Sequence, residues 1–384
     1  MKKTNTLKLY VIIFIAVLHS SVHCVGQEHK AIKGINAALN IHSGNDSTRT
    51  TRASIGIMSS LKRMDGVNIN LIGSGIKEDM NGFMFSGLVS TTGGKAKGVQ
   101  IGMLANVVGN DASGVMFGGM VNASGKTTRG LQIATISNIA EDAAGVQLSA
   151  FSNIASLRAS GTQICGIMNI AREMDRAVQI AGIANVGMDS VSGVQIAPGN
   201  YAGTLNKGVQ IGLLNLCGGE VKGVQVGIIN YSNDTTAHKI GLVNINPQTR
   251  MQMLVAAGNI SKTNIAMRFM NRHNYSIIGF GTHYLGLDDK FSGCIFYRTG
   301  LRKRITPVIE LSGDIGFFHV ENFENEDSYT PERMYSLQAR VNIEFRISRR
   351  LSAFASCGYA STRHYDRNKE FESKPIMEVG VALF

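Results

Sequence analysis

The sequence predicts an all-β protein in two parts: a β-solenoid with coils of about 16 residues, then a small antiparallel β-barrel of about eight strands. Three observations predict this fold. A short apolar motif recurs through the middle of the chain, and the C-terminal third instead holds long alternating segments. No hydrophobic stretch after residue 26 is long enough for a transmembrane helix. The predicted parts are a signal peptide (1–26), an N-terminal cap with degenerate coils (27–65), the repeat solenoid (66–250) and the barrel (251–384).

The first predicted part is a secretory signal peptide. Three lysines precede an apolar run at 9–18, which is too short to span a bilayer. Small and polar residues follow that run, which is the order typical of a cleaved signal. Cleavage after residue 26 makes Gln27 the mature N-terminus. Lipidation at Cys24 is the less favoured alternative, because no small residue directly precedes that cysteine.

The charge of the exported chain bears on its partners. The formal net charge is +11, and removal of the signal takes away three lysines. A basic exported protein has the sign to meet anionic outer-membrane lipid, lipopolysaccharide or acidic glycans, although a solvated surface explains the same charge. No Lys/Arg-rich run with interleaved aromatic residues is present, so nucleic acid is not expected as a partner.

The second and third predicted parts rest on an internal repeat. Within one copy, Val99, Ile101 and Met103 alternate with Gln100 and Gly102, which is the pattern of a half-buried strand. An asparagine ends most copies and turn-forming residues follow it. Successive copies begin fifteen or sixteen residues apart, at Gly66, Gly82, Gly98, Gly114, Gly130, Gly145, Gly161, Ala177, Gly193, Gly208 and Gly223.

A repeat of this length predicts one coil of a solenoid. A strand with a crossover helix needs about thirty residues, but sixteen suffice for two short strands and two turns. Equivalent residues would then stack about 4.8 Å apart along the axis. The alternative is that the repeats are hairpin strands of one large barrel shared with the C-terminal segments. The polar half of each copy disfavours that alternative.

A column of glutamines is the most regular polar feature of the repeat. If these side chains point outward, their stacked amides can form a hydrogen-bonded ladder that stabilises the solenoid. As a functional alternative, they form an interaction face for glycans or for another surface protein. The residues of this candidate face are Gln100, Gln132, Gln147, Gln163, Gln179, Gln195, Gln210 and Gln225.

The fourth predicted part is an outer-membrane type of barrel. In segment 337–347 a fully apolar face alternates with a polar and charged face, which is typical of a strand with lipid outside and a polar lumen. Strands are expected to begin near Met251, Asn264, Tyr275, Phe291, Ile305, Met334, Leu351 and Lys374. The expected lumen residues of one strand are Gln338, Arg340, Asn342, Glu344 and Arg346. Candidates for an interfacial aromatic girdle are Tyr275, Tyr284, Tyr297, Tyr335 and Tyr359.

Several interpretations of this barrel remain open. Glu310, Asp314 and Arg268 join the lumen set in a predicted salt-bridged plug, with a small pore as the alternative. The last strand ends on Phe384 and resembles the C-terminal signal that the outer-membrane assembly machinery reads, although Glu378 stands where that signal usually has an apolar residue. The short basic segments "LRKR" and "SRR" are expected to be turns. A soluble periplasmic β-domain is the alternative to a membrane barrel.

No motif in the sequence indicates catalysis, a metal or a cofactor. "GGMVNASGKTTRG" (118–130) contains Gly-Lys-Thr, but its glycine spacing does not match a phosphate-binding loop and a repeat strand follows it. No H-E-x-x-H or G-x-S-x-G is present. The remaining histidines and acidic pairs are scattered. We therefore predict a protein that is not an enzyme and that needs no cofactor.

The serial units "GVQIGMLAN", "GVQIGLLN" and "GVQVGIIN" resemble the GVQIGLxN surface-repeat proteins of Bacteroidota and spirochaetes. The resemblance covers about residues 66–246. It implies an exported, non-catalytic protein at the outer membrane or cell surface of a Gram-negative bacterium. The expected function is a solenoid scaffold for interaction or adhesion, anchored by the barrel. The alternative is a porin-like or small-solute transport protein in which repeats and C-terminal strands form one barrel.

Overall fold

The computed structural model describes residues 35–37, 41–43, 50–283, 290–325, 332–365 and 369–383. The predicted signal peptide, most of the expected N-terminal cap before residue 50, and Phe384 lie outside the described residues. Every regular element that is described is a β-strand. Within these ranges, no helix is long and apolar enough to cross a membrane. The chain divides into two compact units, 1–224 and 225–384.

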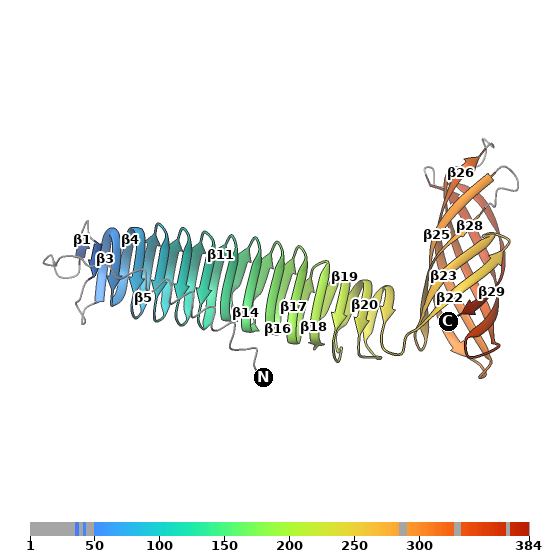
Figure 1. The fold of residues 1–384 in the computed structure, drawn as a ribbon, viewed down its shortest axis with the longest axis horizontal. Helices are drawn as coiled ribbons and strands as arrows, with labels where there is room; N and C mark the ends of the chain where they lie inside the picture. The colour runs from blue at the N-terminus through green and yellow to red at the C-terminus, as the bar shows by residue number, and fades with distance from the viewer. Residues whose placement is uncertain are drawn as a thin grey trace. The chain divides into compact units, whose positions relative to one another are not determined.

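Residues 50–245 form a parallel β-solenoid, with two short strands before residue 50 (β1 and β2) paired in parallel on β3, and Figure 1 shows its stacked coils. A typical coil holds two strands joined by tight turns, such as β7 followed by β8. The strands are β1 (Ile35–Ala37), β2 (Ile41–Ser43), β3 (Thr50–Leu61), β4 (Arg63–Ile76), β5 (Met80–Ser86), β6 (Val89–Thr92), β7 (Ala96–Gly102), β8 (Ala105–Val108), β9 (Ala112–Gly118), β10 (Val121–Ser124), β11 (Thr127–Ala134), β12 (Ser137–Ala143), β13 (Val146–Ser149), β14 (Ser152–Ala159), β15 (Thr162–Cys165), β16 (Met168–Ala181), β17 (Ala184–Ile196), β18 (Gly199–Leu205), β19 (Val209–Cys217), β20 (Val224–Ser232) and β21 (His238–Ile245).

The register of the coils confirms the predicted solenoid. Gly82 pairs in parallel with Gly98, Gly98 with Gly114, and Gly114 with Gly130, so each motif lies directly on its next copy. Hairpin strands of one large barrel would pair antiparallel instead. The alternative of a single barrel that includes the repeats is therefore wrong.

The first position of each motif is a corner of the coil. Gly98 has φ +114°, a backbone conformation that side chains with a Cβ rarely adopt. A Cβ at Gly98 would also lie 2.0 Å from the carbonyl oxygen of Gly82 in the preceding coil. Where Ala177 replaces the glycine, Arg176 takes the positive φ instead, at +50°. The recurring glycine therefore reflects a sharp corner packed against the corner before it.

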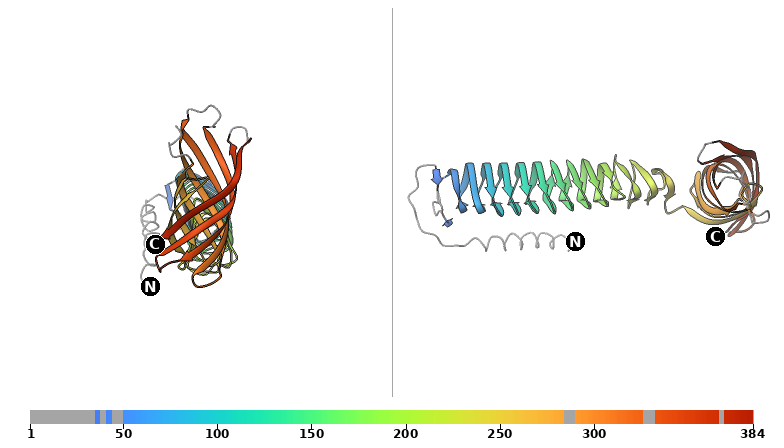
Figure 2. Two further views of the ribbon diagram at one scale, coloured as in Figure 1. Left: turned by 90° about the vertical axis from the view of Figure 1, so that its right-hand side faces the viewer. Right: turned by 90° about the horizontal axis from the view of Figure 1, so that it is seen from above.

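The second part is a closed barrel of eight antiparallel strands, in which β22 also pairs with β29. Figure 2 shows the closed ring. The strands are β22 (Arg250–Gly258), β23 (Thr263–Met270), β24 (Asn274–Thr282), β25 (Lys290–Arg304), β26 (Ile309–Asn325), β27 (Arg333–Arg346), β28 (Leu351–His364) and β29 (Glu370–Leu383). The fold class predicted from the sequence is confirmed in both parts.

Three expectations about strand ends are wrong. The strand expected near Ile305 begins at Ile309, because 305–308 is a turn in which the Thr306 hydroxyl accepts the N–H of Ile309 at 2.9 Å. Pro307 at its centre has no N–H to give to a ladder. "LRKR" (301–304) belongs to β25 and is not a turn. The last strand begins at Glu370, four residues before the expected Lys374.

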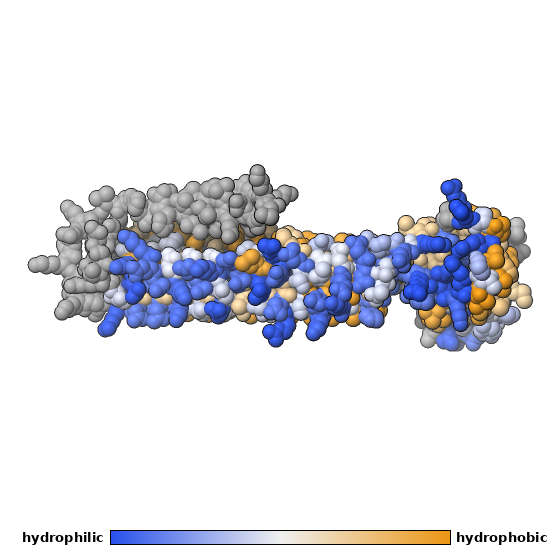
Figure 3. Space-filling model, turned by 90° about the horizontal axis from the view of Figure 1, so that it is seen from below, coloured by the Kyte–Doolittle hydropathy of each residue, from blue (hydrophilic) through white to orange (hydrophobic). Residues whose placement is uncertain are grey.

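Alternation along the strands separates the two surfaces of the barrel wall. In β27, Leu337 and Val341 are exposed on the outside, whereas Gln338 and Arg340 are buried in the lumen. Cys294 is buried and Cys357 is exposed, and no disulfide joins them. Figure 3 shows hydrophobic residues on the outer wall around a hydrophilic barrel end.

Candidate functional site

All eight glutamines of the expected interaction face lie inside the solenoid. Their side chains are buried, and Gln100, with 2% exposure, is the most accessible of them. They occupy the second position after the corner glycine, and alternation along the strand turns that position inward while Val99 and Ile101 turn outward. The expectation of an exposed amide face for glycans or a partner protein is therefore wrong.

The buried glutamines form a ladder along the axis. Gln147 Nε2 donates to Gln132 Oε1 at 2.7 Å, and Gln163 Nε2 donates to Gln147 Oε1 at 2.7 Å. The same bond continues through Gln179, Gln195 and Gln210, at 2.8–3.0 Å. Each of these amides donates to the glutamine one coil closer to the N-terminus, and Gln132, the first of the run, donates instead to Met116 Sδ at 3.6 Å. We call this run, from Gln132 to Gln210, the glutamine ladder.

A second ladder runs beside it in the opposite direction. Asn106 Nδ2 donates to Asn122 Oδ1 at 2.8 Å, and Asn153 Nδ2 donates to Asn169 Oδ1 at 3.0 Å, so each amide donates toward the C-terminus. The other amide hydrogen reaches a backbone carbonyl of the next coil, as in Asn106 Nδ2 to Phe117 O at 2.7 Å. We call this run, from Asn106 to Asn215, the asparagine ladder. Buried amides are thus paired with their own kind, as burial of polar groups requires.

The glutamine column is interrupted in the N-terminal coils. Met84 and Met116 occupy the same position as Gln100 and Gln132 in adjacent coils. Gln100 therefore lies between two methionines, and its Oε1 has no hydrogen-bond partner, although its Nε2 donates to Ser90 O at 3.3 Å. The position accepts either an apolar side chain or an amide. The residues of this column therefore fill the interior of the coil, whether they are glutamines or methionines.

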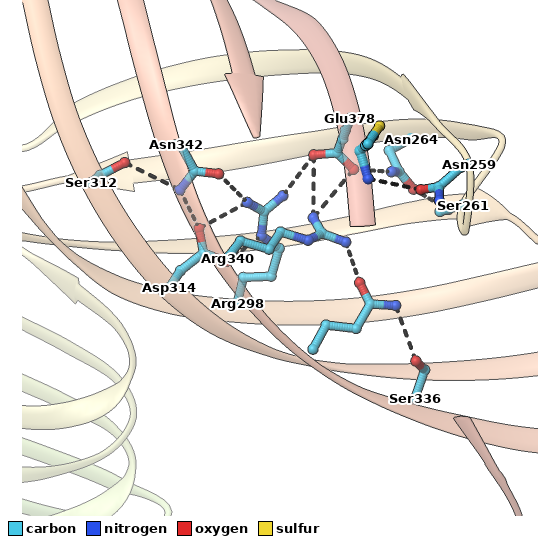
Figure 4. A network of polar contacts seen from close by, with 12 residues as sticks. Asn259, Ser261, Asn264, Arg298, Ser312, Asp314, Ser336, Arg340, Asn342 and Glu378 are labelled. Atoms are coloured by element: carbon cyan, nitrogen blue, oxygen red, sulfur yellow. Dashed lines mark hydrogen bonds and ion pairs between the residues drawn. The ribbon is translucent and has the colours of Figure 1, made fainter. Parts of the chain in front are cut away.

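The barrel lumen holds a buried network of charges, drawn in Figure 4. Arg298 donates through Nε and Nη2 to both carboxylate oxygens of Asp314, each at 2.8 Å. The two side chains are only 5% and 1% exposed. Asn342 and the hydroxyl of Tyr275 each donate to Asp314 Oδ2 at 2.8 Å. This set links four strands of the barrel, β24 to β27.

Glu378 is the second anion of this network. Its carboxylate accepts hydrogen bonds from Arg298 Nη1 at 3.2 Å, from Arg340 Nη1 at 3.2 Å and from Asn264 Nδ2 at 2.9 Å. Arg340 also donates to Gln338. The acidic residue that departs from the usual terminal-strand pattern is therefore the residue that joins the last strand to the lumen network.

Two further ion pairs lie in the lumen. Arg268 Nη1 donates to Glu344 Oε2 at 2.7 Å, and Arg302 Nε donates to Glu310 Oε1 at 2.6 Å. Among the expected lumen residues, Arg346 alone takes no part in these ion pairs and hydrogen bonds. Its side chain is half-buried at the end of β27. Sequence reasoning did not identify Arg298 or Asn264 as lumen residues.

The expected aromatic girdle is only partly placed on the outer wall. Tyr275 is in the lumen and belongs to the network, which makes its assignment to the girdle wrong. Tyr335 and Tyr359 are on the outer wall, and Tyr335 packs edge to face on Tyr365, with ring centroids 5.5 Å apart. Tyr284 lies outside the described residues.

Side chains fill the space that the network leaves. Phe296 and Phe318 stack inside the barrel with centroids 4.6 Å apart, and Met334 packs in the same cluster. A cavity beside Arg298 and Glu344 has a volume of about 10 Å³, enough for about one water. Across the described ranges, no cluster of His, Cys, Asp and Glu is arranged to hold a metal ion. The geometry is that of a plugged barrel.

No family model and no curated protein matches this chain. Among solved structures, it is similar to a de novo designed transmembrane β-barrel, at 13% identity and a TM-score of 0.24, over 36% of this chain and 97% of that chain. It is also similar to CarO of Acinetobacter baumannii, at 8% identity and a TM-score of 0.20, over 35% of this chain and 96% of that chain. The resemblance to the surface-repeat family stays a prediction.

Proposed function

We propose that this protein is an exported, non-catalytic outer-membrane protein, in which the barrel is a membrane anchor and the solenoid is a scaffold. The observation that carries the proposal is the inverted polarity of the barrel. Ile315, Val341 and Val379 are 54–66% exposed on its outer wall, while Arg298 and Asp314 are buried within it. A protein in water has the opposite arrangement, and a barrel in lipid has this one.

The backbone and the length of the barrel suit the same environment. A closed barrel has no edge strand, so its backbone groups are paired within the wall, as the hydrocarbon region of a membrane requires. Strands β27, β28 and β29 each have 14 residues, and a tilted transmembrane strand needs about 9–11. Tyr335, Tyr365 and His319 cluster near one end, where aromatic residues are enriched at membrane interfaces.

The filled lumen supports an anchor in preference to a transport protein. Arg298, Arg340 and Glu378 meet across the lumen, and the aromatic pair Phe296 and Phe318 packs in the same barrel. Eight strands leave an interior just wide enough for side chains to fill. The solenoid, for its part, offers a long regular surface of the kind that repeat proteins use for binding. Its partners in this proposal are outer-membrane lipid or lipopolysaccharide, another surface protein, and the outer-membrane assembly machinery.

Fractionation of cells that express the full chain tests the location. We expect the protein in the outer-membrane fraction, with a change in gel mobility on heating that reports an intact barrel. Recovery in the soluble periplasmic fraction would contradict the membrane anchor. Planar-bilayer recordings test the lumen: we expect no channel events, and steady unit conductance would contradict the plug.

A further inference from the structure

The solenoid carries an exposed apolar corner that the proposed scaffold does not explain. It is the turn between the two long sides of each coil, five to six residues after the corner glycine. Large apolar side chains recur there in most coils and are 36–70% exposed, whereas the coil that begins at Gly193 has Pro198 and Gly199 at this place. We call this row the ridge, and its most exposed members are Leu71, Leu88, Met103, Phe151, Ile183 and Leu213.

The two sides that meet at the ridge are also apolar. On one side, Ile69, Ile164 and Ile211 point outward three residues after the corner position and are 37–41% exposed. On the other, Tyr201 points outward at 39%. Coils that repeat at about 4.8 Å bring the apolar side chains of neighbouring coils next to one another, with an interruption of the ridge at Pro198 and Gly199. Contiguous exposed apolar surface larger than a few hundred Å² is unusual on soluble monomers, and where it occurs it marks a contact surface.

Charge is confined to the other edge of the coil. Segments that run from the corner position through the ridge, such as 66–76, 98–108 and 208–218, contain no Asp, Glu, Lys or Arg, and this holds for each coil between residues 66 and 218. The charged residues precede the corner, about half a coil from the ridge. Lys95 and Asp111 form a 3.3 Å ion pair there between adjacent coils.

We call the row of charged residues that precede the corner position the charged edge. A second pair on it, Arg172 with Asp189, is 2.8 Å long. Figure 3 shows hydrophilic residues along the solenoid. Between residues 66 and 218 the solenoid is therefore amphipathic across its width.

We infer that the ridge lies in the acyl-chain layer of a lipid leaflet, with the charged edge toward water. The same division of an apolar stripe from a charged stripe lets an interfacial helix lie in a membrane surface. Backbone groups at the ridge do not oppose this, because they are bonded from coil to coil: Leu104 N–H donates to Leu88 O at 2.8 Å and Met120 N–H to Leu104 O at 2.8 Å. Unpaired backbone groups are what lipid excludes.

Shape favours lipid over a second copy of the chain. The most exposed apolar residues are at a convex corner, and two convex corners meet only along a line, which leaves both pairs of flanking sides uncovered. A fluid layer of acyl chains covers the corner and both sides together. On the charged edge, opposite charges pair with each other between coils. Contact of the solenoid with the lipid leaflet therefore does not require anionic lipid headgroups. The inference depends on the proposed function in one respect, namely that the barrel brings the solenoid to a membrane.

Single tryptophans test the inference, because the natural chain contains none. The full chain is reconstituted in neutral phosphatidylcholine vesicles with brominated acyl chains, which quench a neighbouring indole. Leu213→Trp and, in a second variant, Met103→Trp report on the ridge. Lys126→Trp on the charged edge is the matched control, and Ile315→Trp on the outer wall reports on the barrel. We expect blue-shifted emission and several-fold stronger quenching at both ridge positions than at Lys126→Trp, unchanged at high salt.

Each other outcome is decisive. Ridge emission as weakly quenched as that of Lys126→Trp overturns the inference, whether or not Ile315→Trp is quenched. Blue-shifted but unquenched ridge emission means that a second copy covers the ridge, which also overturns it. Quenching at the ridge without quenching at Ile315→Trp supports the ridge and contradicts the barrel anchor instead.

Discussion

The solenoid and the barrel both bury polar side chains, but the solenoid buries amides and the barrel buries charges. Parallel coils place each residue on its own counterpart about 4.8 Å away. A column of charges at that spacing would repel, whereas an amide is both donor and acceptor and pairs with its copy. In the barrel, different strands face one another across the lumen, so Arg298 can meet Asp314 and Glu378. Topology therefore decides which polar chemistry a core can hold.

A charge inserted into the glutamine ladder should break the solenoid most severely. Gln163→Glu places a carboxylate between Gln147 and Gln179, where its buried charge has no cation and one donated bond is lost. We expect a loss of about 5 kcal/mol in the free energy of unfolding at neutral pH. Urea unfolding of the full chain, followed by circular dichroism, measures it.

The matched control comes from the chain itself. Gln163→Met puts at this position the residue that Met84 and Met116 provide in earlier coils. It leaves Gln147 Oε1 without its donor and Gln179 Nε2 without its amide acceptor, and should cost about 2–3 kcal/mol, less than the buried charge. Equal losses for the Glu and Met variants at neutral pH would contradict the argument from self-pairing.

Removal of one charge from the lumen should have the next largest effect. Arg298→Met leaves Asp314 without a cation and leaves Glu378 with Arg340 alone. We expect a loss of about 3–5 kcal/mol in the free energy of unfolding. The control is Arg172→Met on the charged edge. The Arg172–Asp189 pair has the same 2.8 Å distance but is 47% and 52% exposed, so its loss should cost less than about 1 kcal/mol. For the barrel variant, the stability is measured as the urea concentration at which half of the protein loses the gel mobility of the intact barrel. For the solenoid variant, it is measured by urea unfolding followed by circular dichroism. Similar losses in the free energy of unfolding for Arg298→Met and Arg172→Met would show that burial does not determine how much an ion pair stabilises this protein.

The smallest expected effect is a pH dependence on the charged edge. Burial acts to raise the pKa of Asp111, but hydrogen bonds from Lys95 and the Thr127 N–H, with the charges of Lys95 and Arg129, outweigh it and hold that pKa below its usual range. A carboxyl with a lowered pKa stabilises the fold above its unfolded pKa of about 3.9, and that contribution is lost as the pH falls through the folded pKa. Asp111→Asn should thus cost less than about 1 kcal/mol at pH 7 and less still at pH 2–3, because the contribution falls away as the carboxyl is protonated. Thermal unfolding at both pH values checks it, and a cost that persists undiminished at low pH would contradict this assignment.

Sequence patterns predicted the repeat length and the barrel wall because both depend on spacing within one strand. The direction of Gln163 was not predictable in this way, since Val, Ile and Gln alternate and the usual rule sends the polar residue outward. Only the pairing of one coil with the next makes an amide column stable inside. The link of Arg298 to Glu378, 80 residues apart, depends on how the strands are staggered around the barrel, which no local pattern contains.

The opposite directions of the two amide ladders bear on how long such a protein can grow. Glutamine amides align their dipoles one way along the axis and asparagine amides the other way, so the two sets largely cancel. An added coil then brings no accumulating dipole, and its donors and acceptors are met by the neighbours already present. Lengthening by duplication of a whole coil is therefore almost neutral for the core, and the number of coils is free to vary.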